Sequence, residues 1–211
     1  MRPGLELARL LQGRRLLIFD FDGTIADSSP LHEQAFREVL EPLGLSVDYA
    51  QLAGRATLDA VRHCFALNRR EPGDEAQLAD FSRRKQERGR ELIATRLTAF
   101  PAAAALLEWV RPRHRLALVT SGSRATIDLA LTRLGLVGWF DPLLTADELD
   151  RAKPDPQGFR EALRLAGIAP DGALVFEDSD AGFEAARRAG IEVVDAAALE
   201  SLMISEGVDG N

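Results

Sequence analysis

The stretch LLIFDFDGTIADSS, residues 16–29, decides the fold of this chain, because an apolar run within it stops at acidic residues. Residues 16–19 are all apolar, and the chain then turns polar at Asp20, Asp22 and Gly23. A short apolar run bounded by turn residues is typical of a strand that is buried on both faces. The pattern therefore predicts a buried strand whose carboxyl end carries Asp20 and Asp22.

Four later segments repeat this pattern of an apolar run followed by polar residues. They are residues 116–122, 173–182, 191–195 and, more weakly, 142–147. Stretches with helical periodicity lie between them, at residues 102–110, 124–134, 157–166 and 181–189. Several end at glycines in positions typical of a helix stop. The alternation of strands and helices predicts an α/β fold with a parallel sheet flanked by helices.

Residues from about 28 to 99 differ from this pattern, because they lack a convincing strand and carry mainly helical periodicity. We interpret them as a small helical domain inserted after the first strand. The predicted division is residues 1–27 with 100–211 as one domain, and residues 28–99 as the other.

Composition narrows the class of protein. Of the 211 residues 46% are hydrophobic and 28% are charged, which is the balance of a folded globular protein. The formal net charge of −7 does not favour binding to a polyanion, so we expect no nucleic-acid partner. Cys64 is the only cysteine, which fits a reducing compartment. No apolar run has membrane-spanning length. We expect a cytoplasmic protein without a membrane partner, as a monomer or a small homo-oligomer.

Polar residues follow the predicted strands at the ends where a parallel sheet binds its ligands. Because these ends share one edge of the sheet, four separate segments bring carboxylates, hydroxyls and a lysine to one place. These residues are Asp20, Asp22, Thr120, Ser121, Lys153, Glu177 and Asp178.

The chemistry of this set indicates phosphate transfer with Mg²⁺. Clustered carboxylates repel one another unless a cation neutralises them, and their oxygens suit Mg²⁺. A shielded carboxylate such as Asp20 can attack phosphorus and form an aspartyl-phosphate. Asp22 is our candidate general acid and base. Backbone N–H groups near Ser121 and Gly122, together with Lys153, can hold phosphate oxygens.

Four segments taken in order resemble the signature motifs of the haloacid dehalogenase superfamily, in its phosphatase branch. They are LLIFDFDGTIADS at 16–28, LVTSGS at 118–123, AKPDP at 152–156 and VFEDSDAG at 175–182. True dehalogenases of the superfamily lack an aspartate at the position of Asp22, so the resemblance disfavours dehalogenation. It implies a Rossmann-like core and, for residues 28–99, a helical cap that closes over the active site.

The resemblance also implies roles for individual residues. Asp20 would be the nucleophile and Asp22 the acid and base. Mg²⁺ would be held by Asp20, the main-chain carbonyl of Asp22 and Asp178, with Glu177 supporting the site directly or through water. Ser121 and Lys153 would match the phosphate-binding pair of the family.

Shorter matches resemble the β-phosphoglucomutase and fructose-1-phosphate phosphatase subgroup. They are Asp27 with the SSPLH that follows it at 28–32, AGR at 53–55 and EDS at 177–179. This resemblance implies that His32, Arg55 and Lys85 are cap residues that would touch the substrate or steady Asp22. His32 can equally be a packed or surface histidine, and Arg55 can pair with a carboxylate.

The expected function is that of a Mg²⁺-dependent phosphatase acting on a small phosphorylated metabolite, with a sugar phosphate preferred. A β-phosphoglucomutase-like phosphotransferase and a phosphoglycolate phosphatase are the alternatives within the enzyme class. A catalytically silent binding protein on the same fold is the alternative outside it.

Overall fold

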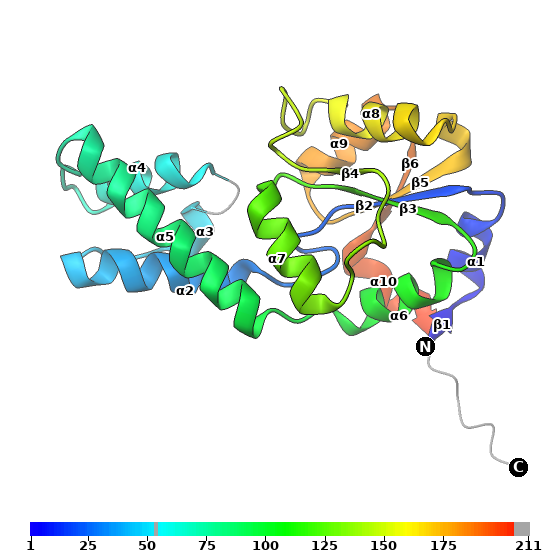
Figure 1. Cartoon of the computed structure of the whole chain (residues 1–211), viewed down its shortest axis with the longest axis horizontal. Helices are drawn as coiled ribbons and strands as arrows, with labels where there is room; N and C mark the ends of the chain where they lie inside the picture. Colours follow the sequence, from blue (N-terminus) through cyan, green and yellow to red (C-terminus); the bar gives the residue numbers. More distant parts are fainter. Residues whose placement is uncertain (53–54, 205–211) are drawn as a thin grey trace, which may run out of the picture. The chain divides into compact units, whose positions relative to one another are not determined.

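A computed structural model describes residues 1–52 and 55–204 of the chain (Figure 1). Their contacts divide the chain into two compact units. The sheet unit comprises Met1–Asp27 and Thr98–Asn211, and the helical unit comprises Ser28–Leu97. Each unit has a hydrophobic core of its own.

A five-stranded parallel sheet forms the centre of the sheet unit, as the sequence predicted. Its strands lie in the order β4-β3-β2-β5-β6, so that β2, the first of the five in sequence, is central. The strand bounds are Leu16–Phe19 for β2, Arg115–Val119 for β3, Leu143–Leu144 for β4, Ala173–Glu177 for β5 and Glu192–Asp195 for β6. Because β3 and β5 flank β2, the carboxyl ends of these three strands meet at one edge.

Helices cover both faces of this sheet (Figure 1). Helices α8 (Gln157–Ala166) and α9 (Asp180–Arg188) pack on one face, and Phe159 of α8 is fully buried against β2 and β3. The opposite face is covered by α1 (Leu5–Leu11), α6 (Pro101–Val110), α7 (Arg124–Leu134) and α10 (Leu199–Leu202). Every side chain of β2 is buried, which explains the uninterrupted apolar run in its sequence.

The helical unit consists of α2 (Ser29–Leu40), α3 (Tyr49–Leu52), α4 (Thr57–Leu67) and α5 (Glu75–Arg96). Helix α5 packs against both α2 and α4. Its first turn is fixed by a capping box, in which Asp74 and Gln77 exchange side-chain and backbone hydrogen bonds. Helix α5 is 22 residues long.

Sequence periodicity missed the shortest elements. Strand β1 (Arg2–Pro3) pairs antiparallel with β7 (Met203–Ile204), and two residues are too few to show an alternating pattern. Three 3₁₀ turns were also not predicted; they are η1 (Glu41–Leu43), η2 (Pro170–Gly172) and η3 (Ala196–Ala198). Among residues 1–52 and 55–204, no helix is both long and apolar enough to cross a membrane.

Candidate active site

The loop after β2 is held in a tight turn by its own backbone and by two buried side chains. The N–H of Ile25 donates to the carbonyl of Phe21 over 2.9 Å, and the N–H of Gly23 donates to the carbonyl of Ala26 over 2.9 Å. Phe21 and Ile25 are both buried, which anchors the turn in the core. Asp20 is also buried, directly after the central strand.

Lys153 lies in the segment between β4 and α8, and its ammonium group donates to the carboxylates of both Asp20 and Glu177. All three side chains are nearly inaccessible, with exposures of 11% for Lys153, 10% for Asp20 and 1% for Glu177. A buried lysine of this kind needs charged partners to stay ionised. Residues that are 133 positions apart in sequence thus form one charge cluster.

Glu177 connects this cluster to the start of α9. One of its carboxylate oxygens accepts from Lys153, and the other accepts from the N–H groups of Asp178 and Ser179 over 2.8 and 3.0 Å and from the Ser179 hydroxyl over 3.1 Å. Gly182 leaves room for this carboxylate, since a Cβ there would lie 1.9 Å from the Glu177 carboxyl carbon. Both oxygens are therefore occupied in positioning Lys153 and the turn.

Asp178 stands at the outer side of the cluster and reaches solvent. Its carboxylate accepts a long hydrogen bond of 3.4 Å from the Thr24 hydroxyl. Gly23, with φ of 85°, packs directly beneath it, and a Cβ at Gly23 would lie 1.9 Å from an oxygen of Asp178. Only glycine meets both demands, the positive φ and the close approach.

Burial and neighbouring charges raise the pKa values of two carboxyl groups of the cluster, those of Asp20 and Asp178. Burial raises the pKa of Asp20 to about 7; Lys153 opposes the rise, and Glu177 and Asp22 add to it. Partial burial and the neighbouring Glu177 raise the pKa of Asp178 to about 6. Burial acts against ionisation of Lys153, but Asp20 and Glu177 raise its pKa above the usual value. The cluster therefore favours the charged form of Lys153 and disfavours the ionised forms of Asp20 and Asp178.

The donor set fits a hard divalent cation. One carboxylate oxygen from each of Asp20, Glu177 and Asp178 can be chosen so that all lie within 4.8 Å of one another. Oxygen ligands from carboxylates are those that Mg²⁺ prefers. Burial and the charge of Glu177 raise the pKa values of Asp20 and Asp178, and a cation bound beside these carboxyl groups would favour their ionised forms.

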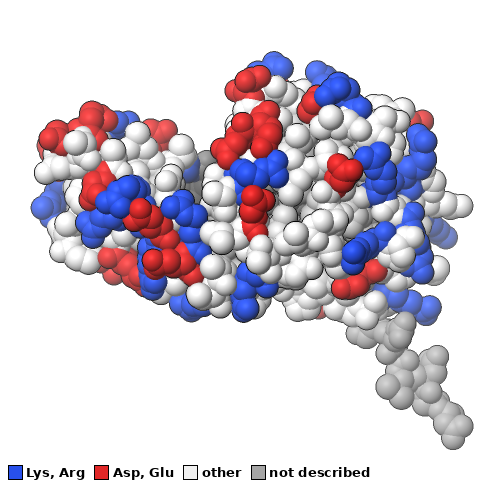
Figure 2. All heavy atoms as spheres, viewed as in Figure 1, with Lys and Arg blue, Asp and Glu red and all other residues white. Residues whose placement is uncertain are grey.

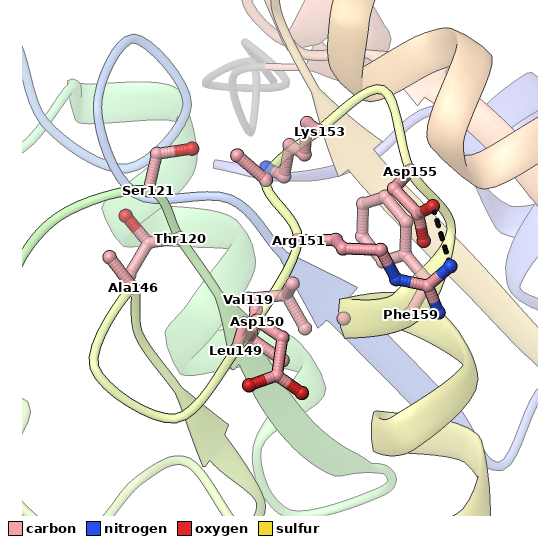
Figure 3. A pocket seen from close by; sticks show the side chains of 12 residues that line it. Val119, Thr120, Ser121, Ala146, Leu149, Asp150, Arg151, Lys153, Asp155 and Phe159 are labelled. Carbon is pink, nitrogen blue, oxygen red and sulfur yellow. Dashed lines mark ion pairs between the residues drawn. The ribbon is translucent and has the colours of Figure 1, made fainter. Parts of the chain in front are cut away.

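A pocket of about 190 Å³ adjoins the cluster beside the end of β3 (Figure 3). Ser121 and Lys153 lie at one end of it, and the Arg151–Asp155 ion pair lies on the other side of the view. The Ser121 hydroxyl makes no hydrogen bond to any described residue, so it is available to a ligand. The N–H of Gly122 instead donates to the Thr120 hydroxyl over 3.1 Å, which is a contact that the sequence did not indicate.

The three residues expected to touch substrate belong to the helical unit. His32 of α2 and Lys85 of α5 contact each other, with 3.2 Å between the ring Nδ1 and the ammonium nitrogen. Lys85 is 6% exposed and lies over the ring of Phe36. Burial and the Lys85 charge lower the pKa of His32 to about 4. Arg55 is exposed and its side chain donates to the Gln51 carbonyl over 3.1 Å; residues 53 and 54 of the AGR motif lie outside the described residues.

Sequence reasoning gave no role to Ser179 and Thr24 in supporting the acidic cluster. Ser179 caps α9 by accepting from the N–H of Gly182 over 3.1 Å, and its hydroxyl also donates to Glu177. A serine just before a helix is a recognisable capping signal, so the first of these roles was accessible from the sequence. The contact between Thr24 and Asp178 joins residues 154 positions apart, so no local sequence pattern could have predicted it.

Comparisons with known proteins identify the family of the chain. The family described as haloacid dehalogenase-like hydrolase matches residues 17–196. The chain is 34% identical over 182 residues to the fructose-1-phosphate phosphatase YqaB of Escherichia coli, covering 85% of this chain and 94% of that protein. It is 31% identical to the phosphorylated carbohydrates phosphatase of Thermotoga maritima, covering 83% and 82% of the two chains. The crystal structure of CbbY from Rhodobacter sphaeroides in complex with phosphate superposes with a TM-score of 0.72 at 30% identity, covering 85% and 84%.

Proposed function

Since the chain belongs to the haloacid dehalogenase-like hydrolase family, we propose that it is a phosphatase that hydrolyses the phosphate ester of a small carbohydrate. Relatives named for fructose 1-phosphate and for phosphorylated carbohydrates support this class of substrate. The observation that carries the proposal is the buried contact of Lys153 with Asp20 and Glu177 at the carboxyl edge of the sheet.

Asp20 is the proposed nucleophile. Its carboxylate oxygen forms a bond to phosphorus while the bond from phosphorus to the ester oxygen breaks, giving an aspartyl-phosphate and the free alcohol. Asp22 gives its proton to the departing oxygen. It then takes a proton from the water that attacks phosphorus, which releases inorganic phosphate and restores Asp20.

The remaining residues of the sheet unit orient the phosphate. Lys153 neutralises charge on the phosphoryl oxygens, and Ser121, which also lines the pocket, donates from its hydroxyl. Gly122 contributes through its backbone once its N–H leaves the Thr120 hydroxyl. Glu177 keeps Lys153 in place, which makes it a positioning residue as well as a candidate support for the cation.

Mg²⁺ is the proposed cofactor, held by Asp20, Asp178 and the main-chain carbonyl of Asp22, with Glu177 behind them. When bound, it supplies positive charge that lets a carboxylate approach a phosphate dianion. The fit rests on the oxygen donors and on the raised pKa values of Asp20 and Asp178.

The helical unit is proposed to be the cap domain that selects the substrate, through His32, Lys85 and Arg55. The contact between His32 and Lys85 supports a polar site within this unit, because a lysine so deeply buried is rare without a role or a partner.

The test is release of inorganic phosphate from fructose 1-phosphate, other sugar phosphates and phosphoglycolate, with Mg²⁺ and with a chelator. We expect release that depends on Mg²⁺, and a loss of about a thousandfold or more in Asp20→Asn, because the nucleophile is removed. Asp128→Asn is the matched control, since Asp128 is an exposed aspartate on α7.

Three other outcomes would change the conclusion. Phosphoglycolate as the best substrate would move the enzyme to a different substrate class. Conversion of β-glucose 1-phosphate to glucose 6-phosphate without net release of phosphate would assign a phosphotransferase. Equal activity in Asp20→Asn and Asp128→Asn would overturn the role of Asp20.

A further inference from the structure

A basic groove lies at the edge of the sheet where β2 and β3 begin. Its volume is about 530 Å³. In Figure 2, Lys and Arg side chains gather at this end of the sheet unit, where α1 and the start of β3 lie in Figure 1. The lining residues are Arg14, Arg15, Arg111, Pro112, Arg113, His114, Arg115, Ala166, Gly167 and Ile168. Five arginines thus share one hollow on a chain whose formal net charge is −7.

Two of these arginines hold the protein itself together. Arg14 donates to the carbonyls of Asp171 and Ala173 over 2.6 and 3.1 Å, and it pairs with Glu192. Arg115 donates to the carbonyl of Ala166 over 2.8 Å, at the last residue of α8, where a positive charge is favourable. These contacts fix the walls of the groove, and they give two of its five arginines a structural role.

The other three arginines, Arg15, Arg111 and Arg113, have no acidic partner among residues 1–52 and 55–204. Arg111 and Arg113 instead stack on aromatic rings, with their guanidinium carbons 4.2 Å from the centroid of Trp139 and 4.6 Å from that of Trp109. Stacking holds a guanidinium group in place. Arg113 also donates to the carbonyl of Trp109 over 2.6 Å, which uses one of the five N–H donors of its guanidinium group. Three fixed or exposed cations without counter-charges therefore border the groove.

We propose that this groove is a binding site for a small anion that carries two or more phosphate groups. Guanidinium groups match phosphate oxygens in a two-pronged geometry, and several arginines in one hollow select a ligand with several anionic groups. The volume lies in the range of pockets that bind small molecules. A free polyphosphate and the polyphosphate chain of a nucleotide present the same chemistry to these arginines.

The groove and the candidate active site lie at opposite ends of the same strands. Arg15 precedes β2, whereas Asp20 follows it; Arg115 begins β3, whereas Ser121 lies beyond its end. A strand rises about 3.3 Å per residue, so about 15 Å of sheet separates the two sites. A ligand in the groove therefore does not compete with a substrate that is bound at Asp20.

The test uses the full chain, without Mg²⁺, titrated with inorganic tripolyphosphate and separately with ATP. The chain has two tryptophans, and each lies under an arginine of the groove, so we expect a saturable change in intrinsic fluorescence. Calorimetry gives the dissociation constant independently of fluorescence. Tighter binding of ATP would indicate that a nucleoside contributes, and equal binding would indicate that the phosphate chain alone is recognised.

Arg15→Gln combined with Arg111→Gln removes two uncompensated charges and keeps the Arg113–Trp109 contact as a reporter. We expect the affinity for tripolyphosphate to fall about tenfold or more, because charge-assisted hydrogen bonds are lost. Arg187→Gln with Arg188→Gln is the matched control, with the same change in charge on α9 and outside the groove. Circular dichroism verifies that both variants are folded.

Several outcomes would overturn the proposal. One is the absence of saturable binding at concentrations up to about 10 mM, and another is equal weakening in both double variants. Loss of binding in Asp20→Asn with retention in the Arg15 and Arg111 variant would place the anion in the active site instead. Preference for RNA over tripolyphosphate at matched phosphate concentration would indicate a different class of ligand. Phosphatase activity of the Arg15 and Arg111 variant is expected to be unchanged, so failure of this proposal is distinguishable from failure of the proposed function.

Discussion

At the scale of single residues, the candidate site depends on two glycines, because a side chain at either position would collide with a carboxylate of the cluster. Gly23 lies beneath the Asp178 carboxylate, and Gly182 lies beside the Glu177 carboxylate. A methyl group at either position would displace an acidic group of the cluster. The geometry of the site therefore depends on the missing Cβ atoms of these two glycines as well as on the charged residues.

Gly182→Ala is expected to lower kcat/KM about tenfold or more, because displacing Glu177 also displaces Lys153, and small misplacements of catalytic groups are costly. It should also reduce the free energy of unfolding by about 1–3 kcal/mol through overpacking. Gly172→Ala is the control, since its Cβ would lie 3.0 Å from Ile168, outside the charge cluster. Steady-state kinetics and urea unfolding of both variants separate the two effects. Equal loss of activity in both variants would contradict the prediction.

The raised pKa values of Asp20 and Asp178 predict that Mg²⁺ binding depends on pH. Without metal, these carboxyl groups have pKa values of about 7 and about 6, so a cation must displace protons at lower pH. We expect the rise in melting temperature on adding Mg²⁺ to be larger at about pH 8 than at about pH 5.5.

In the metal-free protein, these carboxyl groups make the fold less stable as the pH rises, which is the opposite of the expected effect of pH on stabilisation by Mg²⁺. A carboxyl group with a raised pKa stabilises the fold at low pH, and this stability is lost as the pH rises through the folded pKa of about 7. Adding Mg²⁺ should therefore reverse the slope of stability against pH. Calorimetric titration with Mg²⁺ in two buffers with different ionisation enthalpies would detect the protons that the carboxyl groups release when the metal binds. A metal effect that is independent of pH would contradict the assignment of Asp20 as a ligand.

At the scale of elements, the packing of α2 against α5 buries a histidine next to a lysine. The pKa of His32 is lowered to about 4, from an ordinary value of 6.5. A depressed histidine pKa means that the unfolded chain takes up the proton first, so stability is present above about pH 6.5 and is lost as the pH falls toward 4. The shift corresponds to a loss on the order of 3 kcal/mol at the acid end.

The substitution His32→Gln should remove this loss of folding stability at acid pH, because glutamine does not titrate. Urea unfolding of the parent and the variant at about pH 7 and about pH 4.5 isolates the histidine, because the other titrating groups are common to both proteins. We expect the parent to lose more stability than His32→Gln on acidification. Parallel losses in the two proteins would show that His32 does not carry the effect.

Sequence and structure agree best where one element has a strong pattern of its own. The apolar run of β2 and the helical period of α8 are local properties, so both elements were predicted within a residue or two. The parallel sheet and the convergence of Asp20, Lys153 and Glu177 followed from general rules of topology. The contact between His32 and Lys85 did not follow from these rules, because the sequence analysis treated each residue as a separate substrate contact. Their pairing depends on how two helices pack.

The basic groove was also missed by sequence reasoning, for a related reason. Residues 111–115 read RPRHR, which is an ordinary solvated turn when it stands alone. Only the parallel register of β2 and β3 brings Arg15 beside this turn, where the N–H of Arg115 donates to the carbonyl of Arg15 over 3.0 Å. A concentration of charge that arises from strand pairing is not visible in either segment by itself.

At the scale of the whole molecule, the proposed metal ligands all belong to the sheet unit, and the helical unit has a separate core. We expect Mg²⁺ to slow amide hydrogen exchange in residues 20–26 and 177–182, and to leave the core of α4 unchanged. Exchange measured by mass spectrometry with and without Mg²⁺ gives the comparison, and Asp178→Asn should abolish the protection. Equal protection in Thr57–Leu67 would show that the two units respond as one body.

The central position of β2 has a consequence for the order in which this protein is made. Leu16 pairs with Arg115 on one side and with Ala173 on the other. The ribosome therefore delivers the strand before Asp20 long before either neighbour, while the core of the helical unit, within Ser28–Leu97, is complete in the nascent chain at an intermediate stage. The last strand to flank β2 carries Glu177 at its end, so the charge cluster can assemble only after that strand has been synthesised. The proposed nucleophile, Asp20, is thus synthesised well before the two strands that complete its surroundings.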